Sequence, residues 1–218
     1  MRSYVAGLWI LLLVLTAQRA NAQSYAVASP DQSVSVRIEA TDQLQYSVTF
    51  AGQPVIAESS LGFAFNGEPD LQKDLSVVRA VSSSRHDVWT PVVKSKHAKI
   101  TDACNELVLV TEEKAGLRRR MDIVFRAYDD GVAFRYRLYR SGHIGNRQLT
   151  GELTTFHIPG NPAAWVVEYA TPYASSYESE FKKKTLDDVT EKTVAGLPFL
   201  MKYSDTCWVA VTEAEIDN

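Results

Sequence analysis

The most informative run of residues is Arg126-Ala-Tyr-Asp-Asp-Gly-Val-Ala-Phe-Arg-Tyr136, which predicts a turn followed by a strand. Asp129-Asp130-Gly131 is a turn signal, because glycine reaches positive φ freely and aspartate side chains cap nearby backbone donors. After the turn, apolar residues at positions 132, 134, 136 and 138 alternate with residues 133, 135, 137 and 139. This period of two is typical of a strand with one apolar face and one polar face. The arginines on the polar face are either solvated or in contact with a polar partner, and the pattern leaves both readings open.

The sequence on both sides of this run also predicts strands. Turn signals recur about every 8–12 residues, which is typical of antiparallel sandwiches. Asp42 separates two alternating runs that form a predicted hairpin, and Pro54 is expected at a strand start or an edge. Helical signals are weak and confined to residues 175–184 and 186–194. Strands are expected at 33–38, 44–50, 61–65, 75–81, 107–111, 121–127, 132–139, 149–158, 165–168 and 207–212.

The first 22 residues have the features of a signal peptide. Arg2 supplies a positive start, residues 5–15 form a short apolar run, and Ala20-Asn21-Ala22 matches an Ala-x-Ala cleavage site. An uncleaved membrane anchor is the alternative, against which the shortness of the apolar run argues. We therefore expect an exported mature chain, residues 23–218, of 218 − 22 = 196 residues. This length suits one all-β domain in which two antiparallel sheets face each other.

Charge and cysteine content exclude some classes of function. The chain has a net charge of −3, and loss of Arg2 and Arg19 makes the mature chain about −5. An acidic protein is a poor candidate for nucleic-acid binding, and the basic runs 118–120 and 182–184 are short enough to be solvated strand ends. Cys104 and Cys207 form either a disulfide or two free thiols. Two cysteines and four scattered histidines give no zinc-binding spacing.

No self-contained catalytic motif is visible, but one segment has the composition of a carbohydrate-binding site. The sequence has no Gly-x-Ser-x-Gly elbow, no phosphate-binding loop and no pair of carboxylates set apart by spacing. Aromatic faces stack on sugar rings, and carboxylates accept hydrogen bonds from sugar hydroxyls or bind hard cations. An ordinary core aromatic cluster with exposed glutamates is the competing interpretation. The segment contains Trp165, Tyr169, Tyr173 and Tyr177 together with Glu168 and Glu178, and we select Trp165, Tyr173 and Tyr177 as candidate substrate-binding residues.

Short motifs in order along the chain resemble the N-terminal domain of glycoside hydrolase family 97. The run from Phe125 to Tyr136 is the most specific match, and the resemblance covers residues 25–218. The weaker matches are Ser29-Pro30-Asp31, Gly52-Gln53-Pro54-Val55, Ser60-Leu61-Gly62, Trp89-Thr90-Pro91, Asn105-Glu106-Leu107, Tyr177-Glu178, Leu197-Pro198 and Thr212-Glu213-Ala214.

The resemblance implies a galactose-mutarotase-like β-super-sandwich joined to a catalytic (β/α)8 barrel and a small C-terminal β-domain. It implies a periplasmic enzyme that acts on an α-linked glucoside or galactoside oligosaccharide and uses calcium, with its catalytic acid and base or nucleophile in the barrel. A barrel needs roughly 250 residues, so this chain resembles the front portion of such an enzyme and no catalytic residue is expected in it.

The resemblance also carries over one metal ligand. The family's N-terminal domain contributes one glutamate to the calcium, and Glu178 matches that position best, with Glu213 in reserve. One carboxylate is far short of the 6–8 oxygens, approximately, that Ca²⁺ takes, so binding by the isolated chain is expected to be weak or absent. Two other functions stay open: a free-standing periplasmic carbohydrate-binding module, and a structural or interaction β-sandwich without sugar affinity.

Overall fold

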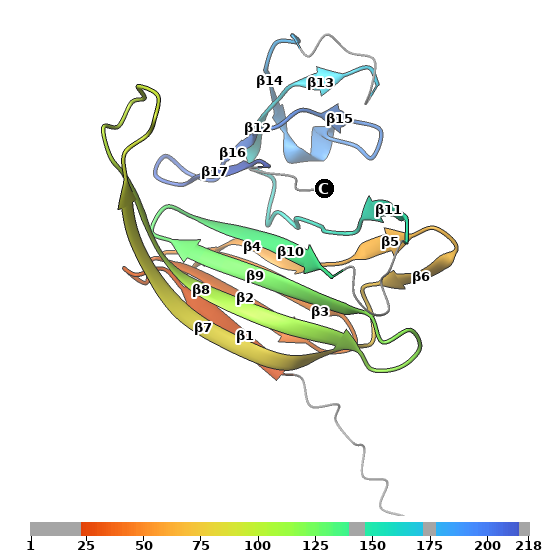
Figure 1. Cartoon of the computed structure of the whole chain (residues 1–218). Helices are drawn as coiled ribbons and strands as arrows, with labels where there is room; N and C mark the ends of the chain where they lie inside the picture. Colours follow the sequence, from red (N-terminus) through yellow and green to blue (C-terminus); the bar gives the residue numbers. More distant parts are fainter. Residues whose placement is uncertain (1–22, 140–146, 172–177, 214–218) are drawn as a thin grey trace, which may run out of the picture.

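The computed structural model describes residues 23–139, 147–171 and 178–213, and these fold almost entirely into antiparallel strands (Figure 1). The expected all-β, antiparallel sandwich is confirmed. The predicted signal peptide lies outside the described residues. None of the described segments forms a helix that is long and apolar enough to cross a membrane.

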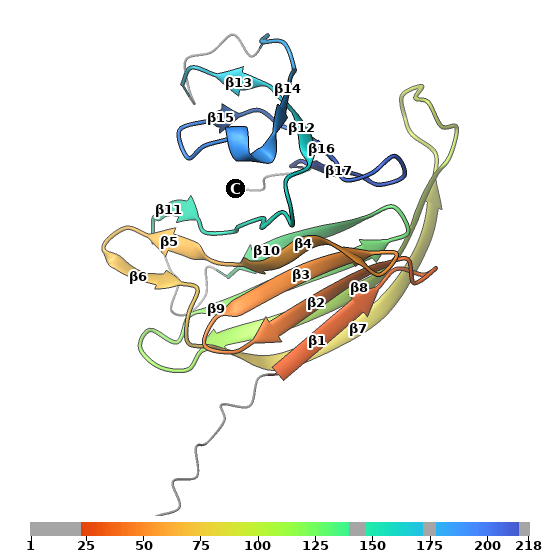
Figure 2. The ribbon, with the colours of Figure 1, turned by 180° about the vertical axis from the view of Figure 1, so that it is seen from behind.

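Two four-stranded sheets stack to form the body of the molecule (Figures 1 and 2). Pro54 lies near the start of β4, which is the last strand of its sheet, as expected for a residue without a backbone donor. The first sheet has the order β1-β2-β3-β4, with β1 (Gln23–Ala28), β2 (Val34–Ala40), β3 (Leu44–Phe50) and β4 (Gln53–Ser60). The second has the order β10-β9-β8-β7, with β7 (Leu75–Trp89), β8 (Ile100–Glu113), β9 (Arg120–Tyr128) and β10 (Gly131–Leu138).

The run Arg126–Tyr136 builds one wall of the main core. Its apolar residues Val132, Phe134 and Tyr136 pack against the buried cluster between the two sheets. Phe134 lies 5.5 Å from both Tyr46 and Phe125, measured between ring centroids, so aromatic rings from three strands meet there. Arg135 points away from this core and is exposed. The strand therefore has one face packed on the core, as the alternation of apolar residues predicts.

The Asp129-Asp130-Gly131 turn also ties the two sheets together at one end. The Asp129 carboxylate accepts a hydrogen bond from the backbone N–H of Asp31 at 3.0 Å, and Ser33 Oγ donates to the Asp129 carbonyl oxygen at 3.3 Å. In the facing turn, the Ser29 hydroxyl donates to the Asp31 carboxylate at 2.6 Å, and this bond, followed by the bonds from Ser33, lowers the pKa of Asp31 to about 2. Asp31 and Asp129 are thus capping groups, because their carboxylates accept hydrogen bonds from backbone donors that the strand ladders leave open.

Strands β7 and β8 form a hairpin that is longer than the sequence predicts and extends past the sandwich. They pair continuously from Leu75 opposite Glu113 to Trp89 opposite Ile100, with one bulge between Val77 and Arg79. Strand β9 pairs with β8 only from Asn105 to Glu112, so the far end of the hairpin is a two-stranded ribbon. We call residues 85–104 the arm, and it rises beyond the sheets in Figure 1.

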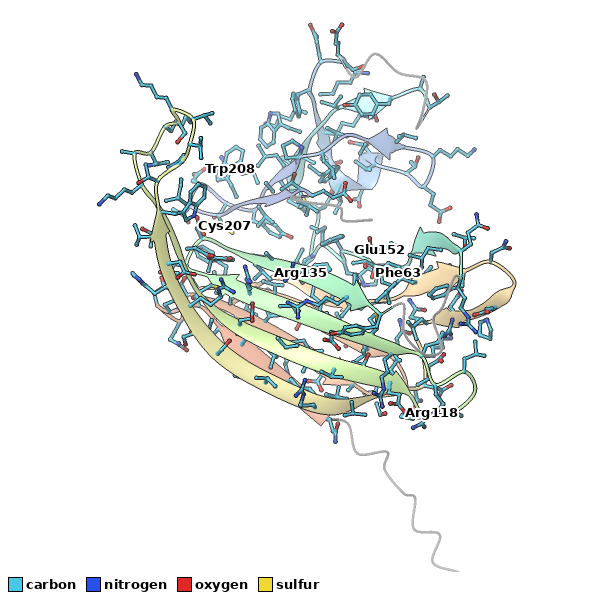
Figure 3. All side chains as sticks on the ribbon, in the orientation of Figure 1. Phe63, Arg118, Arg135, Glu152, Cys207 and Trp208 are labelled. Carbon is cyan, nitrogen blue, oxygen red and sulfur yellow. The ribbon has the colours of Figure 1, made fainter. Side chains whose placement is uncertain are left out.

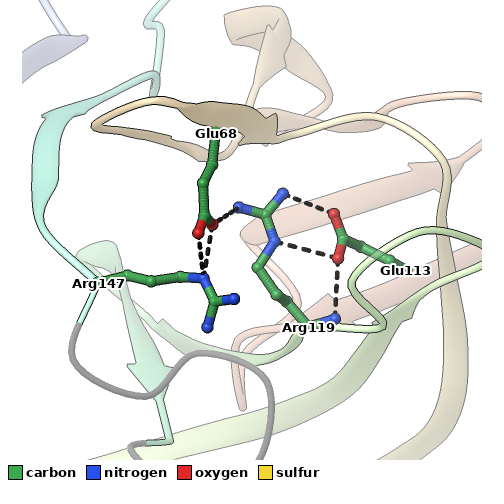
Figure 4. A network of polar contacts seen from close by, with 4 residues as sticks. All are labelled: Glu68, Glu113, Arg119 and Arg147. Carbon is green, nitrogen blue, oxygen red and sulfur yellow. Dashed lines mark hydrogen bonds and ion pairs between the residues drawn. The ribbon is translucent and has the colours of Figure 1, made fainter.

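A buried ion-pair network, the clamp, fixes a third small sheet to the body (Figure 4). The Arg119 side chain is fully buried and donates to both oxygens of Glu113, at 3.0 Å from Nε and 2.6 Å from the guanidinium end. Glu68 lies 3.8 Å from Arg119 and 2.6 Å from Arg147. Phe63 on the same small sheet meets Tyr136 edge to face at 4.7 Å. This sheet has the order β11-β5-β6, with β5 (Phe63–Phe65), β6 (Glu68–Leu71) and β11 (Leu149–Glu152).

Residues 159–171 and 178–213 form a separate C-terminal lobe above the sandwich (Figure 1). Its main sheet has the order β14-β12-β16-β17, with β12 (Ala163–Val166), β14 (Lys182–Thr185), β16 (Phe199–Lys202) and β17 (Trp208–Val211). A second pair joins β13 (Glu168–Tyr169) to β15 (Val194–Ala195). The lobe contacts the body where the Tyr203 hydroxyl donates to the Val55 carbonyl oxygen at 2.6 Å.

Three sequence-based expectations need correction or resolution. The predicted helices 175–184 and 186–194 are wrong within the described residues, where 182–185 is a strand and only η1 (Leu186–Asp188) is a short 3-10 turn. Pairing of β14 with β12 overrides the local preference of the lysine run for helix.

The strand expected at 149–158 ends at Glu152, although His157 still makes a single bridge to Ala57. Cys104 and Cys207 are both free thiols, so the disulfide alternative is not realised.

Candidate functional site

The outer face of the main sheet in the C-terminal lobe carries the clearest cluster of exposed aromatic residues. Ala164, Val166 and Met201 point to the inner side of this sheet and are fully buried. Strand alternation therefore places Trp165 on the outer side, next to Lys183 on one neighbouring strand and Leu200 on the other. Across the last strand pair, Leu200 is opposite Ala210, and Lys202 is opposite Trp208. We call this outer surface the tryptophan face.

A shallow apolar cavity of about 350 Å³ opens on the tryptophan face. Trp165 and Trp208 lie beside it with ring centroids 5.0 Å apart and an angle of 32° between their planes. Trp208 is 47% exposed and Phe181 is 56% exposed, so large aromatic surfaces are open to solvent. Figure 3 shows Trp208 on the side of the molecule where the arm extends. The cavity is lined by Trp165, Phe181, Pro198, Leu200 and Ala210.

Two ammonium groups border the aromatic rings. Lys183 Nζ lies 5.4 Å from the centroid of Trp165, and Lys202 Nζ lies 5.3 Å from the centroid of Trp208, both within the range of cation–π attraction. Lys202 also donates to the Asp205 carboxylate at 2.6 Å. The face thus combines aromatic rings with ammonium donors that lie over them. This is the chemistry that a sugar ring requires, since its C–H face stacks on an aromatic ring and its hydroxyls bond to polar groups.

The neighbouring residues that the sequence singled out have other roles. Glu168 accepts a hydrogen bond from Lys184 at 2.6 Å and lies 3.6 Å from Lys182. The bond from Lys184 is the largest cause of the lowered pKa of Glu168, which stays ionised and paired. The ring of Tyr169 packs so closely over Gly196 that a Cβ there would lie 2.6 Å from the tyrosine hydroxyl. Tyr173 and Tyr177 lie outside the described residues.

The two candidate calcium ligands do not form a metal site in the described part of the chain. Glu178 and Glu213 are both exposed. Across residues 23–139, 147–171 and 178–213, no group of three or more His, Cys, Asp or Glu side chains is arranged to hold a metal ion. Ca²⁺ takes about 6–8 oxygen ligands, so these residues alone do not fit a complete calcium site.

A second hollow, of about 390 Å³, lies between strand β1 and the β7–β8 pair, and several of its polar groups are already hydrogen-bonded. Ser84 donates to Asn105 at 2.7 Å, and Asn105 donates to the Ala28 carbonyl oxygen at 2.8 Å. Glu106 accepts from Arg126 at 2.7 Å. The bond from Asn105 on β8 to Ala28 on β1 links the two sheets, so we assign the hollow a structural role.

Sequence reasoning included Trp165 in the candidate site but missed the residues that complete the tryptophan face. Trp208, Phe181, Leu200 and Lys183 come from three other segments, and sheet pairing alone brings them to Trp165. The run Trp208–Val211 could have indicated this face, because Trp208 shares the more exposed face of the strand with Ala210 while Val209 and Val211 point to the other face.

A comparison with family models matches residues 27–218 to the model described as glycosyl-hydrolase 97 N-terminal. The chain belongs to the N-terminal domain family of glycoside hydrolase family 97. The expected resemblance is therefore confirmed, and the match includes both the sandwich and the C-terminal lobe. Members of this family form the N-terminal domain of glycoside hydrolases.

Two curated relatives extend well beyond the part that this chain matches. A retaining alpha-galactosidase from Bacteroides thetaiotaomicron is 23% identical over 219 residues, which are 96% of this chain and 32% of that protein. A probable retaining alpha-galactosidase from Streptomyces bingchenggensis is 26% identical over 172 residues, which are 75% of this chain and 25% of that protein. The chain thus spans about a quarter to a third of the length of these relatives.

Solved structures share the fold. A glycoside hydrolase family 97 enzyme from a Pseudoalteromonas strain, in complex with panose, superposes with a TM-score of 0.73 at 23% identity, over 82% of this chain and 26% of that one. A beta-arabinopyranosidase superposes with a TM-score of 0.78 at 24% identity, over 89% of this chain and 32% of that one. The β-sandwich with its C-terminal lobe is therefore the fold of this part of the larger enzymes.

Proposed function

We propose that this chain is the non-catalytic N-terminal part of an exported, periplasmic α-glycosidase, in which it supports a catalytic barrel and contacts the carbohydrate substrate. The observation that carries the proposal is the family match over residues 27–218, together with the small share of the relatives' length that it represents. The predicted signal peptide, residues 1–22, is the basis for export.

The proposed ligand is an α-linked glucoside or galactoside oligosaccharide held on the tryptophan face. The curated relatives are named as retaining alpha-galactosidases, and two related structures of the family hold panose and acarbose. Trp165 and Trp208 supply aromatic surfaces, and Lys183 and Lys202 place ammonium donors over the two rings. Tyr173 and Tyr177 extend the predicted aromatic set from the adjoining segment.

Calorimetry of the mature chain with maltooligosaccharides and α-galactosyl oligosaccharides tests this proposal. The proposal predicts saturable heat from the mature chain and an affinity at least about tenfold lower in Trp165→Ala. Stacking contributes roughly 1–3 kcal/mol per aromatic residue, so loss of one ring should be measurable. Trp89→Ala is the matched control, since Trp89 is 53% exposed but lies on the arm. Equal losses in both variants, or no heat with any sugar, would contradict binding at the tryptophan face.

The absence of catalysis in this part of the enzyme has its own check. The mature chain is expected to release no aryl leaving group from aryl α-glucoside or α-galactoside above the buffer rate, because acid and base or nucleophile are proposed to come from the barrel. Turnover at enzyme-like rates would contradict a non-catalytic role.

We also propose that Glu178 supplies one ligand to a calcium ion whose other ligands come from the catalytic part. The exposure of Glu178 leaves its carboxylate accessible to such a site. Calcium titration of the mature chain should then give only weak binding. Tight binding that is lost in Glu178→Gln would instead locate a complete site in this chain.

A purely structural role without sugar affinity is the second candidate. The exposed apolar surface of Trp208 and Phe181 favours it, because such surface also serves contacts between domains. If the folded chain gives no heat of binding with any of the sugars, that result would support this structural role.

A further inference from the structure

Strand β7 has a long free edge. It is the last strand in the order β10-β9-β8-β7, so one side of its backbone has no partner among the described residues. All of its residues from Val78 to Trp89 are exposed. Natural proteins usually protect such edges with proline, with lysine or by covering them. Neither proline nor lysine occurs from residue 75 to residue 89, and the one bulge lies near the start of the strand, between Val77 and Arg79, so the edge from residue 80 to residue 89 remains open to another strand.

The sequence of this edge is complementary to itself in antiparallel pairing. When two copies of β7 are aligned antiparallel with Ser83 opposite Ser83, Arg79 of each copy lies opposite Asp87 of the other. The same register brings Val78, which is 53% exposed at the bulge of β7, close to Val88, which is 54% exposed. Opposite charges and apolar side chains in directly opposed positions are the contacts that stabilise antiparallel pairs.

The centre and the charges of the strand also suit this register. The run Ser82-Ser83-Ser84 places three small side chains where two strands would cross the symmetry axis. Asp87 already lies 3.3 Å from Arg85 of its own strand, whereas no ion pair to Arg79 is present among the described residues. In a register centred on His86, which would pair Arg85 with Asp87, only residues 83–89 of each strand could overlap. The register centred on Ser83 therefore gives the longer ladder and satisfies a second arginine.

We propose that two copies of this chain form a twofold symmetric dimer by antiparallel pairing of their β7 edges, centred on Ser83. The sheet β10-β9-β8-β7 of one copy then continues into the same sheet of the other copy. The interface is isologous and closed, so pairing stops at two copies. This inference concerns self-association and is independent of the proposed role in a glycosidase.

Sedimentation over a concentration series, with a charge-swap cycle, tests the register. Arg79→Asp faces Asp87 across the interface twice, so the dimer dissociation constant should rise roughly tenfold or more. The double variant Arg79→Asp, Asp87→Arg restores both opposite-charge pairs and should recover most of the affinity. Arg135→Asp on β10, at the opposite edge of the same sheet, is the matched control and should leave the dimer unchanged.

An engineered cross-link tests the geometry independently. The proposed axis sets the two Ser83 residues directly opposite each other, with Cα atoms about 4.5–5.5 Å apart, which is within disulfide range. Ser83→Cys should therefore yield a covalent dimer on mild oxidation. Ser82→Cys is the control, because its two copies lie diagonally at about 7–8 Å and should cross-link poorly.

Three results would overturn the proposal. They are a monomer at all concentrations, a dimer that is indifferent to the charge-swap cycle, and equal cross-linking at positions 82 and 83. Species larger than a dimer would also contradict a closed twofold interface.

Discussion

At the residue scale, Gly62 is the position where a methyl group should do most damage. Its φ is +153°, and an added Cβ would lie 2.6 Å from the Leu71 carbonyl oxygen and 2.8 Å from Gln72 Cβ. Because backbone atoms occupy that space, Gly62→Ala should lower the free energy of unfolding by about 2–4 kcal/mol. Gly52 has φ +77° and open space around it, so Gly52→Ala should cost only about 1 kcal/mol. Urea unfolding of both variants measures the difference, and equal losses would contradict the steric argument.

Sequence reasoning at this scale recovers what is local and misses what is long-range. The turn at Asp129-Asp130-Gly131 and the capping role of Asp129 were both predictable, because aspartate in a turn readily bonds nearby backbone donors. That Asp129 would accept its bond from Asp31 was not predictable, since the two residues are 98 positions apart. The fully buried Arg119 is a similar case, because nothing in Arg118-Arg119-Arg120 distinguishes the middle residue from its neighbours.

At the element scale, the clamp should hold strand β6 against the β8–β9 hairpin. Glu113→Ala removes the partner that accepts three hydrogen bonds from Arg119 and leaves a buried guanidinium with a single carboxylate at 3.8 Å. The expected loss of unfolding free energy is about 3–5 kcal/mol, as for other broken buried pairs. Glu39→Ala is the control, because it breaks the more exposed Arg37–Glu39 pair and should cost at most about 1 kcal/mol. Thermal or urea unfolding separates the two, and a small loss for Glu113→Ala would show that the clamp is dispensable.

Element types were more predictable than element lengths. Alternation identified β2, β3, β9 and β10 nearly to their ends, because one face of each strand packs on the core. The predicted strand ended at residue 81, whereas β7 continues to residue 89. Residues 82–89 have no apolar alternation, and only their pairing with β8 keeps them in a strand. The lysine run in β14 was read as helix for the same reason: its pairing with β12 depends on a partner that is distant in sequence.

At the scale of the whole molecule, family membership was predictable while the composition of the tryptophan face was not. Ordered motifs identify the family because each depends on local residues. Trp165 meets Trp208 only because β16 lies between their strands in the sheet, and no sequence spacing encodes that arrangement. The calcium ligand Glu178 stays a prediction, because the described residues supply no further ligands around it.

The two parts of the molecule should differ in stability. The body has a large buried cluster drawn from both main sheets, whereas the buried core of the C-terminal lobe is Ala164, Val166 and Met201. A small core buries too little apolar surface to oppose unfolding strongly, so the lobe should open before the body does.

In urea, this difference should separate two optical signals of the mature chain. Two of its three tryptophans, Trp165 and Trp208, belong to the lobe, so fluorescence should change at lower urea than far-UV circular dichroism, which reports mainly the body strands. Amide hydrogen exchange should agree, with β12 and β16 exchanging faster than β2, β8 and β9. The Trp89→Phe variant removes the arm signal and keeps both lobe tryptophans, so it should preserve the early transition. Coincident transitions and uniform protection would mean that the Tyr203–Val55 bond and the packing of Val209 on the body core couple the lobe and body into one cooperative unit.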